Sequence, residues 1–396
     1  MAEPAKRAQY GNFTIAWTSQ TTAAMLIFAV PALAPLLVTK LSLSGTEIGA
    51  LVGVTYIGVS SMSMLFGVVA DNIGIRKVLF LGHLVEAISI VGASFSYNFL
   101  TLAICIFGVG IGYSAITPVT SKAIHDWFPK ENRGSVMGLK QTGTTVGGAL
   151  AGFILPLVGV SLGLQASFIV AGVLVMIGSA FLLGYVEVES RQPTRFDFLR
   201  QGLVSSLKNH RLVATGSLGF FFAAVQAIVV TYIALFSEHS LGFGVVVSGL
   251  FLSLANVSGT IGRPVFGIIS DRLLHGDRVK DLLVIALTSG MMLVLISLFP
   301  PHGSVLLLIP VVALLGFSAL GWNGVFLTLS GEYSGKGYEA VGTSFAFSLG
   351  MLGQVVGAPV FGLLVDITGG FSFSWRLFAL LLVSASVVYT FTSRKR

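Results

Sequence analysis

Long apolar runs separated by short polar segments dominate this chain. They predict twelve membrane helices, each long enough to cross the roughly 30 Å hydrocarbon core of a bilayer. The predicted spans are residues 13–39, 45–70, 78–97, 99–121, 134–157, 163–186, 211–236, 245–270, 280–299, 304–329, 340–366 and 372–392. Because backbone amides must be paired within lipid, such runs favour helices. The pattern therefore predicts an all-α polytopic membrane protein.

The longest polar connection divides these predicted helices into six and six. Residues 187–210 are expected to form a central cytoplasmic loop with a short amphipathic helix near residues 196–207. Ser44 and Glu47 have the spacing of a capping box at the start of the second span. We expect an N-terminal half over residues 1–186 and a C-terminal half over residues 211–396.

A short pattern repeats between the two predicted halves. Gly67 and Asp71 end the second predicted helix, and Gly267 and Asp271 end the eighth, 200 residues later. Equal spacing at corresponding helix ends indicates a parallel duplication, which is a known transporter architecture. We therefore expect pseudo-symmetric halves.

Lysine and arginine are distributed unequally between the two sides of the predicted membrane. Nineteen of the 23 lie on the side of both termini, whereas Lys40 and Arg376 lie on the other side. The positive-inside rule makes the first side cytoplasmic. We expect an integral protein of a prokaryotic inner membrane with both termini in the cytoplasm.

The composition agrees with a membrane protein. Of the residues, 54% are hydrophobic and 10% are charged, whereas soluble proteins contain about 25% charged residues. The net charge of +7 is explained by the cytoplasmic loops, so no nucleic-acid partner is expected. The lone Cys105 provides no disulfide framework. The sequence contains no metal, nucleotide or nucleophile motif, so we expect no cofactor and no enzyme activity. We also expect the protein to be a monomer in the bilayer.

Arg263 is one of two cations inside predicted spans. It precedes Asp271 by eight residues, which places it about 12 Å from the end of the helix and close to the midplane. A guanidinium is costly there and is expected to face a polar cavity or a partner. We interpret it as a cation that binds an anion. The alternative is a structural arginine paired with backbone carbonyls.

Lys140 is the second cation, about 10 Å into the fifth predicted span. Substrates of two-half transporters bind near the midplane between the halves, so both cations are expected to face one cavity. Arginine offers a bidentate fork and lysine a movable charge. Together they predict a small organic anion, in particular a carboxylate. The alternative for Lys140 is snorkelling toward the cytoplasm.

The arrangement of helices and one loop motif resemble the major facilitator superfamily over essentially the whole chain. The motif is Gly67-x3-Asp71-x2-Gly74-x-Arg76-Lys77, and it has Asn72 where the family usually has a basic residue. The resemblance implies alternating access and a cytoplasmic latch formed by Gly67, Asp71, Gly74, Arg76, Lys77, Asp271 and Arg272. Ordinary positive-inside topology is the alternative for Arg76 and Lys77.

The resemblance also implies that helices one, four, seven and ten line the central cavity. The polar and aromatic residues expected to bind substrate beside Lys140 and Arg263 are Gln20, Tyr113, Gln141, Tyr232, Asn256, Trp322, Asn323 and Gln354. Thr117 and Thr120 are spaced to share the helix face of Tyr113. Each residue could instead serve helix packing.

Glu86 is the clearest acid within the predicted spans. His83 lies three residues earlier, so the two side chains can pair on one helix face. A proton relay is one interpretation, because buried carboxylates can titrate near neutrality. A structural or lipid-side role is the other.

These patterns predict a secondary transporter that moves a small organic anion by alternating access, as proton symport or as anion exchange. The sequence GRPVFGIISD around Arg263 resembles the eighth helix of monocarboxylate and oxalate–formate-type porters, in which an arginine at that place binds the carboxylate. The eleventh predicted helix lacks the lysine of the oxalate-type exchangers. The alternative is a proton-coupled exporter of drugs or other apolar compounds, which would depend on Glu86 and tolerate loss of Lys140 and Arg263.

Overall fold

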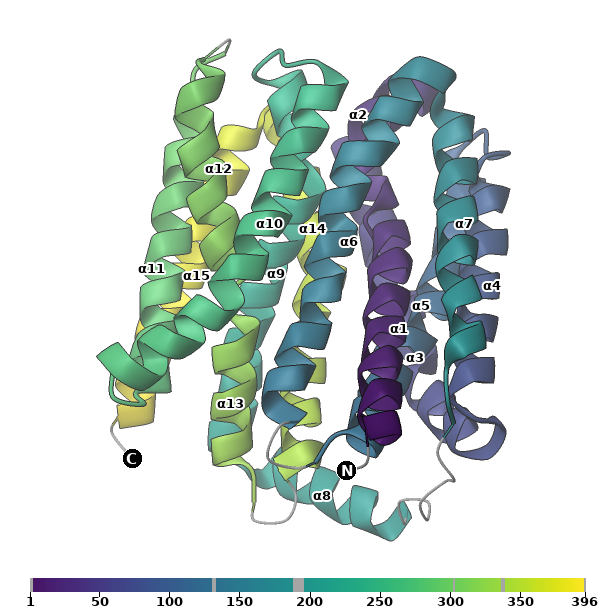
Figure 1. Cartoon of the computed structure of the whole chain (residues 1–396). Helices are drawn as coiled ribbons and strands as arrows, with labels where there is room; N and C mark the ends of the chain where they lie inside the picture. Colours follow the sequence, from purple (N-terminus) through teal and green to yellow (C-terminus); the bar gives the residue numbers. More distant parts are fainter. Residues whose placement is uncertain (1–2, 130–132, 188–195, 302, 336–338, 395–396) are drawn as a thin grey trace. The chain divides into compact units, whose positions relative to one another are not determined.

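The computed structural model describes residues 3–129, 133–187, 196–301, 303–335 and 339–394. Helices make up the regular structure of these residues (Figure 1). They are α1 (Glu3–Ile27), α2 (Ala29–Leu41), α3 (Gly45–Ile73), α4 (Ile75–Ala93), α5 (Phe99–Trp127), α6 (Arg133–Leu162), α7 (Leu164–Ala180), the 3₁₀ turn η1 (Phe181–Gly184), α8 (Phe196–Lys208), α9 (His210–His239), α10 (Val245–Ile268), the π-helical turn η2 (Ile269–Leu273), α11 (Arg278–Ser297), α12 (Val305–Ala319), α13 (Asn323–Tyr333), α14 (Glu339–Thr368) and α15 (Phe371–Arg394).

The predicted all-α membrane architecture is confirmed. Among the described residues, ten helical segments are long and apolar enough to cross a membrane. In this count α1 and α2 together form one span, and so do α12 and α13. Adding α3 and α4 gives the predicted twelve. The capping box is also confirmed, because Ser44 N lies 2.8 Å from Glu47 Oε2 and Glu47 N lies 3.1 Å from Ser44 Oγ.

Two predicted spans are interrupted in the structure. Residues 13–39 were expected as one helix, but α1 begins at Glu3 and a break at Phe28 precedes α2. Pro31 follows closely, and proline cannot donate a backbone hydrogen bond to the preceding turn. The predicted span 304–329 is divided into α12 and α13 by a turn at residues 320–322. This second break places backbone groups beside the polar cluster described below.

The described chain groups into two compact units. The first contains residues 1–43, 51–192 and 245–253, and the second contains residues 44–50, 193–244 and 254–396. The start of α3 therefore belongs to the second unit, and the rest of this helix belongs to the first. The start of α10 belongs to the first unit, and the rest of this helix belongs to the second. The division into halves at residues 187–210 stays a prediction, and the sequence pattern contains no signal for these two exchanged helix starts.

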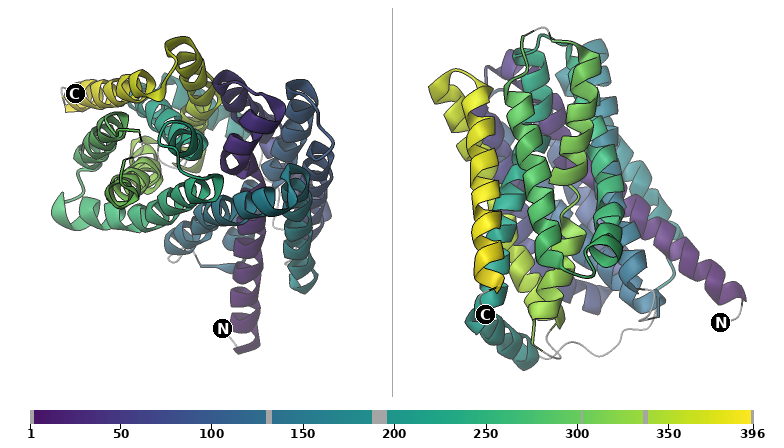
Figure 2. Two further views of the ribbon diagram at one scale, coloured as in Figure 1. Left: turned by 90° about the horizontal axis from the view of Figure 1, so that it is seen from above. Right: turned by 90° about the vertical axis from the view of Figure 1, so that its left-hand side faces the viewer.

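Helices within each unit pack along their length. In the first unit, α4 packs along α5 and α7, and α1 packs along α5 and α6. In the second unit, α14 packs along α9, and α11 packs along α12 and α15 (Figure 2). The predicted amphipathic helix is present as α8, with Leu203, Val204 and Leu207 exposed on its surface.

Glycines let the start of α3 approach α14 closely within the second unit. A Cβ added at Gly49 would lie 2.3 Å from the carbonyl oxygen of Ala358. One added at Gly362 would lie 2.2 Å from the carbonyl oxygen of Gly45. Side chains at these positions would prevent the observed backbone contact.

Candidate functional site

Lys140 is fully buried on α6 in the first unit. Its Nζ donates hydrogen bonds to Thr120 Oγ1 at 3.3 Å and to Ser121 Oγ at 3.2 Å, both on α5. Among the described residues, it forms no ion pair with a carboxylate. The side chain is 0% exposed, so it does not snorkel to the surface in this structure. A buried ammonium with only hydroxyl partners favours an anion beside it.

Gln20 of α1 extends this polar cluster. Its Nε2 lies 2.7 Å from the hydroxyl of Tyr113 and 3.0 Å from Thr144 Oγ1, and its Oε1 accepts a hydrogen bond from Thr120 at 3.2 Å. Thr117 lies 3.4 Å from the same amide nitrogen, so the predicted common face of the three α5 residues is confirmed. Because Thr120 also contacts the buried lysine, α1, α5 and α6 share one hydrogen-bonded chain.

A second polar cluster surrounds the break between α12 and α13 in the second unit. Arg263 Nε on α10 donates to the carbonyl oxygen of Leu320 at 3.2 Å. Gln226 Oε1 on α9 accepts from Trp322 Nε1 at 2.9 Å and from Asn323 Nδ2 at 3.1 Å. Discontinuous membrane helices expose backbone groups that transporters use to bind ions and substrates. The contact between Arg263 and this backbone carbonyl oxygen also has the geometry of the structural alternative.

Tyr232 and Gln354 lie apart from this second cluster. The hydroxyl of Tyr232 lies 2.8 Å from the carbonyl oxygens of both Gly45 and Ala358, at the close approach of α3 and α14. Gln354 Nε2 donates to Met351 Sδ at 3.1 Å within α14. Both side chains therefore have local structural partners.

The remaining predicted substrate residues lie near the two cations in the sequence. Gln141 follows the buried lysine on α6 and is half-buried. Asn256 is fully buried on α10, and its carbonyl oxygen accepts from Thr260 Oγ1 at 3.0 Å. Gln141 therefore belongs to the first unit and Asn256 to the second.

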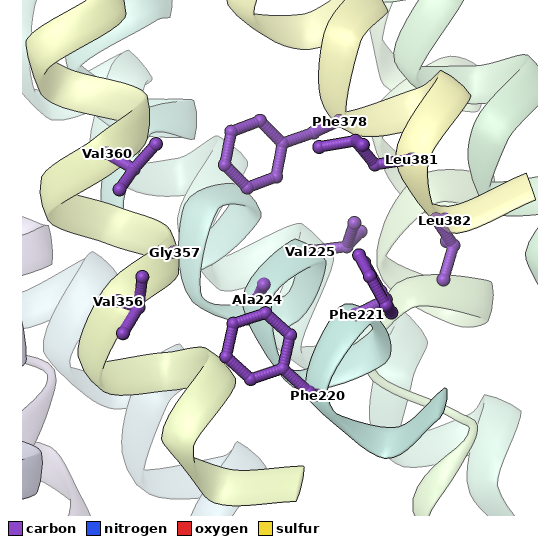
Figure 3. A pocket seen from close by; sticks show the side chains of 10 residues that line it. All are labelled: Phe220, Phe221, Ala224, Val225, Val356, Gly357, Val360, Phe378, Leu381 and Leu382. Carbon is purple, nitrogen blue, oxygen red and sulfur yellow. The ribbon is translucent and has the colours of Figure 1, made fainter. Parts of the chain in front are cut away.

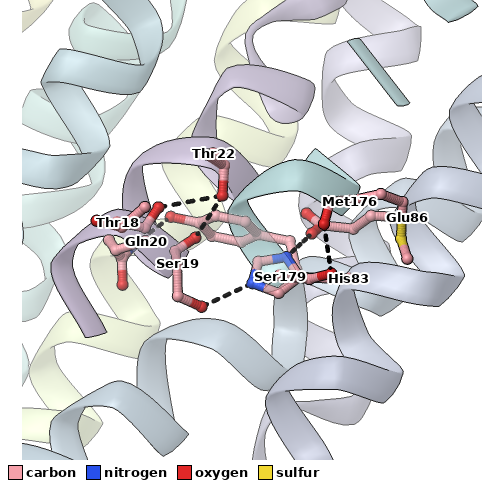
Figure 4. Close-up of polar contacts among 9 residues, drawn as sticks. Thr18, Ser19, Gln20, Thr22, His83, Glu86, Met176 and Ser179 are labelled. Atoms are coloured by element: carbon pink, nitrogen blue, oxygen red, sulfur yellow. Dashed lines mark hydrogen bonds and ion pairs between the residues drawn. The ribbon is translucent and has the colours of Figure 1, made fainter. Parts of the chain in front are cut away.

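A third polar group joins α1 and α4 in the first unit (Figure 4). His83 Nδ1 lies 3.2 Å from Glu86 Oε2, and His83 Nε2 lies 2.7 Å from Ser19 Oγ. Both members of the predicted pair are fully buried. The lipid-side role was therefore wrong, because packing of α4 against three helices encloses them. Ser19 was not predicted, although it precedes Gln20 in a run of polar residues.

The predicted latch residues of the first unit surround the start of α4. Gly74 has φ of 91° immediately before this helix, a conformation that favours glycine. The Glu187 carboxylate accepts hydrogen bonds from the backbone nitrogens of Ile75 at 3.3 Å and Arg76 at 2.7 Å. The side chains of Arg76 and Lys77 are exposed. Sequence reasoning missed Glu187, whose position just beyond the sixth span is its only signal.

The other latch residues have different surroundings. A Cβ added at Gly67 would meet no atom within 4 Å, and the side chain of Asp71 lies outside the described residues. In the second unit, Asp271 forms an ion pair with Arg278, which also contacts Glu332 at 3.5 Å. Arg272 is exposed. The latch function stays a prediction.

Two cavities within the second unit lack the predicted substrate residues. One, of about 120 Å³, lies among α9, α14 and α15 and is lined by apolar side chains and Gly357 (Figure 3). The other, of about 470 Å³, lies at the start of α9, where Arg211 stands 5.7 Å from the ring centre of Tyr333. The first does not suit an anion. Arg211, which lines the second cavity, precedes Gln226 by 15 residues, or about 22 Å along α9.

Residues 16–358 match the sequence model of the Major Facilitator Superfamily. This chain belongs to the Major Facilitator Superfamily. The match covers most of the helices described above, and it confirms the predicted resemblance. The chain is therefore an integral membrane transporter of this superfamily.

Three curated relatives illustrate the range of the family near this chain. An uncharacterised transporter of Mycobacterium tuberculosis is 24% identical over 79% of this chain and 69% of the relative. A probable sulfoacetate transporter of Cupriavidus necator is 24% identical over 88% of this chain and 85% of the relative. A probable L-galactonate transporter of Escherichia coli is 26% identical over 60% and 56%.

Solved structures show the same fold. A bacterial homologue of the human lysosomal transporter Spinster has a TM-score of 0.77 at 16% identity and covers 100% of this chain and 98% of its own. The nucleoside transporter NupG has a TM-score of 0.78 at 17% identity and covers 96% and 98%. At these identities the likeness concerns the fold alone.

Proposed function

We propose that this superfamily member transports a small organic anion, in particular a carboxylate, by alternating access. The observation that carries the proposal is the fully buried Lys140, whose ammonium has two hydroxyl partners and forms no ion pair among the described residues. Desolvating an ammonium costs several kcal/mol unless an opposite charge and hydrogen bonds offset the loss. A bound carboxylate supplies both.

Arg263 is the second proposed contact for the anion. Its Nε already holds the carbonyl oxygen at the break between α12 and α13. That bond fixes the position of the guanidinium, whose planar fork suits a carboxylate. The relatives that are probable transporters of sulfoacetate and L-galactonate support an organic acid, since both of those named substrates are anions at neutral pH.

The test is uptake into proteoliposomes of radiolabelled sulfoacetate, galactonate, glucuronate and lactate, each alone. At least one is expected to enter with wild-type protein. Lys140→Gln and Arg263→Gln are each expected to lower initial uptake by at least about 30-fold, because truncating one partner of a buried charged pair costs about 2–5 kcal/mol. A double variant tests whether the two side chains act on the same anion.

Matched controls are available for both cations. Lys280→Gln removes an exposed lysine paired with Asp277, and Arg376→Gln removes an exposed arginine whose Nε contacts Ser297 Oγ. Both are expected to transport at wild-type rates. Undiminished uptake in Lys140→Gln and Arg263→Gln would contradict the proposal and favour an exporter of apolar compounds.

A further inference from the structure

Glu86 and His83 form an isolated pair of titratable side chains inside the first unit. Glu86 Oε2 contacts the imidazole at 3.2 Å, whereas Oε1 is buried without a hydrogen-bond partner. Neither residue makes any further polar side-chain contact among the described residues except the one to Ser19. Among the elements packed against the pair, α1 presents Ser19 and α7 presents Ser179 (Figure 4). Gly112 of α5 lies against Glu86. None of these carries a charge.

These uncharged surroundings favour one bound proton on the pair of Glu86 and His83. Without it, the pair would carry a buried negative charge with one oxygen lacking a donor, which costs several kcal/mol. With it, the pair is neutral overall, as carboxylic acid with imidazole or as carboxylate with imidazolium. Ser19 suits both forms, because its hydroxyl can donate to His83 Nε2 or accept from it. The pair can therefore gain or lose this proton only when water reaches it.

Helix α1 connects this pair to the cluster at Lys140. Ser19 contacts His83, and the next residue, Gln20, contacts Tyr113 and Thr120. Consecutive helical residues point about 100° apart, so α1 presents one face to each group. A small rotation or shift of α1 changes both sets of hydrogen bonds together. The hydroxyl of Thr120 carries the second connection onward to the lysine Nζ.

We propose that Glu86 and His83 form a proton-binding site that couples one proton to each transported anion, with Ser19 and Gln20 as the mechanical connection. This inference rests on the proposed anion transport. The proton binds to a Glu86 oxygen or a His83 nitrogen from water on the side where the site is open. It leaves to water on the opposite side after the conformational change, and only the O–H or N–H bond forms and breaks. Transport of a monoanion is then electroneutral.

The test separates coupling from transport in proteoliposomes, using whichever of sulfoacetate, galactonate, glucuronate or lactate the wild type takes up. Counterflow exchange of labelled for unlabelled anion at equal pH measures the conformational cycle. Accumulation driven by an imposed pH gradient measures coupling. In Glu86→Gln, which resembles the protonated acid, accumulation is expected to fall at least about tenfold while counterflow stays within about twofold of wild type. The control Asp281→Asn removes a fully buried carboxylate of the second unit and is expected to accumulate normally.

The outcomes distinguish the two proposals. A wild type without counterflow of any of these anions overturns both. A wild type with counterflow but without accumulation on the pH gradient overturns the proton site alone. Unchanged accumulation in Glu86→Gln also overturns the proton site alone.

A second variant decides the matter if Glu86→Gln also loses counterflow. Ser19→Ala keeps both titratable groups and removes one hydrogen bond to His83. Because Ser19 is part of the mechanical connection, this variant is expected to lower accumulation and to shift the pH of half-maximal accumulation by about one unit, while counterflow stays within about twofold of wild type. An unshifted pH profile in this variant overturns the proposal.

Discussion

Lys140 and Glu86 place a basic and an acidic side chain inside one unit, yet the structure does not join them in an ion pair. The lysine contacts α5 hydroxyls, and the glutamate contacts His83 on its own helix. A direct pair would neutralise both side chains and leave neither available to a ligand. The hydroxyl partners satisfy part of the hydrogen bonding of Lys140, and the imidazole does the same for Glu86. The charge of the lysine is then available to an anion.

The position of Glu86 depends on a glycine opposite it. A Cβ added at Gly112 would lie 2.5 Å from Glu86 Cγ and 2.6 Å from the carbonyl oxygen of Gly82. Gly112→Ala is therefore expected to lower the free energy of unfolding by about 1–3 kcal/mol, as overpacked cores do. Thermal unfolding of the purified protein in detergent measures the effect.

Gly138→Ala is the matched control for that variant. A Cβ there meets no atom within 4 Å, and alanine has the higher helix propensity. Its thermal midpoint should equal or exceed that of wild type. Equal midpoints for the two alanine variants would show that the space at Gly112 is not needed.

At the scale of elements, the break between α12 and α13 organises the second cluster. It provides the Leu320 carbonyl oxygen to Arg263 and begins α13 at Asn323, which contacts Gln226. The aromatic ring of Trp322 stacks on Phe222 with ring centres 5.3 Å apart. A continuous helix would have used this carbonyl oxygen within its own backbone.

A glycine within the break makes this arrangement testable. A Cβ added at Gly321 would lie 2.4 Å from the carbonyl oxygen of Phe317 and 2.8 Å from Phe266 Cδ2. Gly321→Ala is expected to shift the Leu320 carbonyl oxygen away from Arg263 and to lower anion uptake by about tenfold, which corresponds to about 1.4 kcal/mol.

The neighbouring Gly324 provides the control for the break. Its added Cβ would meet only the Arg263 carbonyl oxygen, at 3.8 Å. Gly324→Ala should therefore keep wild-type uptake in the same assay. Equal losses in Gly321→Ala and Gly324→Ala would contradict a specific role of the break.

At the scale of the whole molecule, the exchanged helix starts extend one half of the sequence into the other compact unit. Asp366 on α14 holds the start of α3, with Oδ1 2.9 Å from Gly45 N and Oδ2 2.7 Å from Thr46 N. The Thr46 hydroxyl also donates to this carboxylate. A carboxylate at a helix N-terminus satisfies free amides and is favoured by the helix dipole.

Removing this carboxylate should loosen residues 44–50. Loss of a helix N-cap costs about 1 kcal/mol, so Asp366→Ala is expected to speed amide hydrogen exchange in this segment by about fivefold. The control Glu238→Ala removes a carboxylate whose side chain bonds no described residue. Unchanged exchange at residues 44–50 in Asp366→Ala would show that the carboxylate does not hold the helix start.

The sequence by itself determined the membrane architecture and the unusual charges. Hydropathy over more than twenty residues specifies a membrane helix, because lipid admits no unpaired backbone over that length. The sequence also identifies Arg263, Lys140 and Glu86 as unusual, because an ionisable side chain is costly within an apolar span. The spacing of Tyr113, Thr117 and Thr120 also specified their common face.

Only the tertiary structure decided which partners these side chains have. Ser19, Gln226, Glu187 and Asp366 are ordinary polar residues in the sequence, and their roles arise from helices that are distant along the chain. The break at residues 320–322 lies in an apolar run whose one proline, Pro310, is ten residues before it. Hydropathy is a local property, whereas hydrogen-bond partners and exchanged helix starts depend on the packing of separate helices.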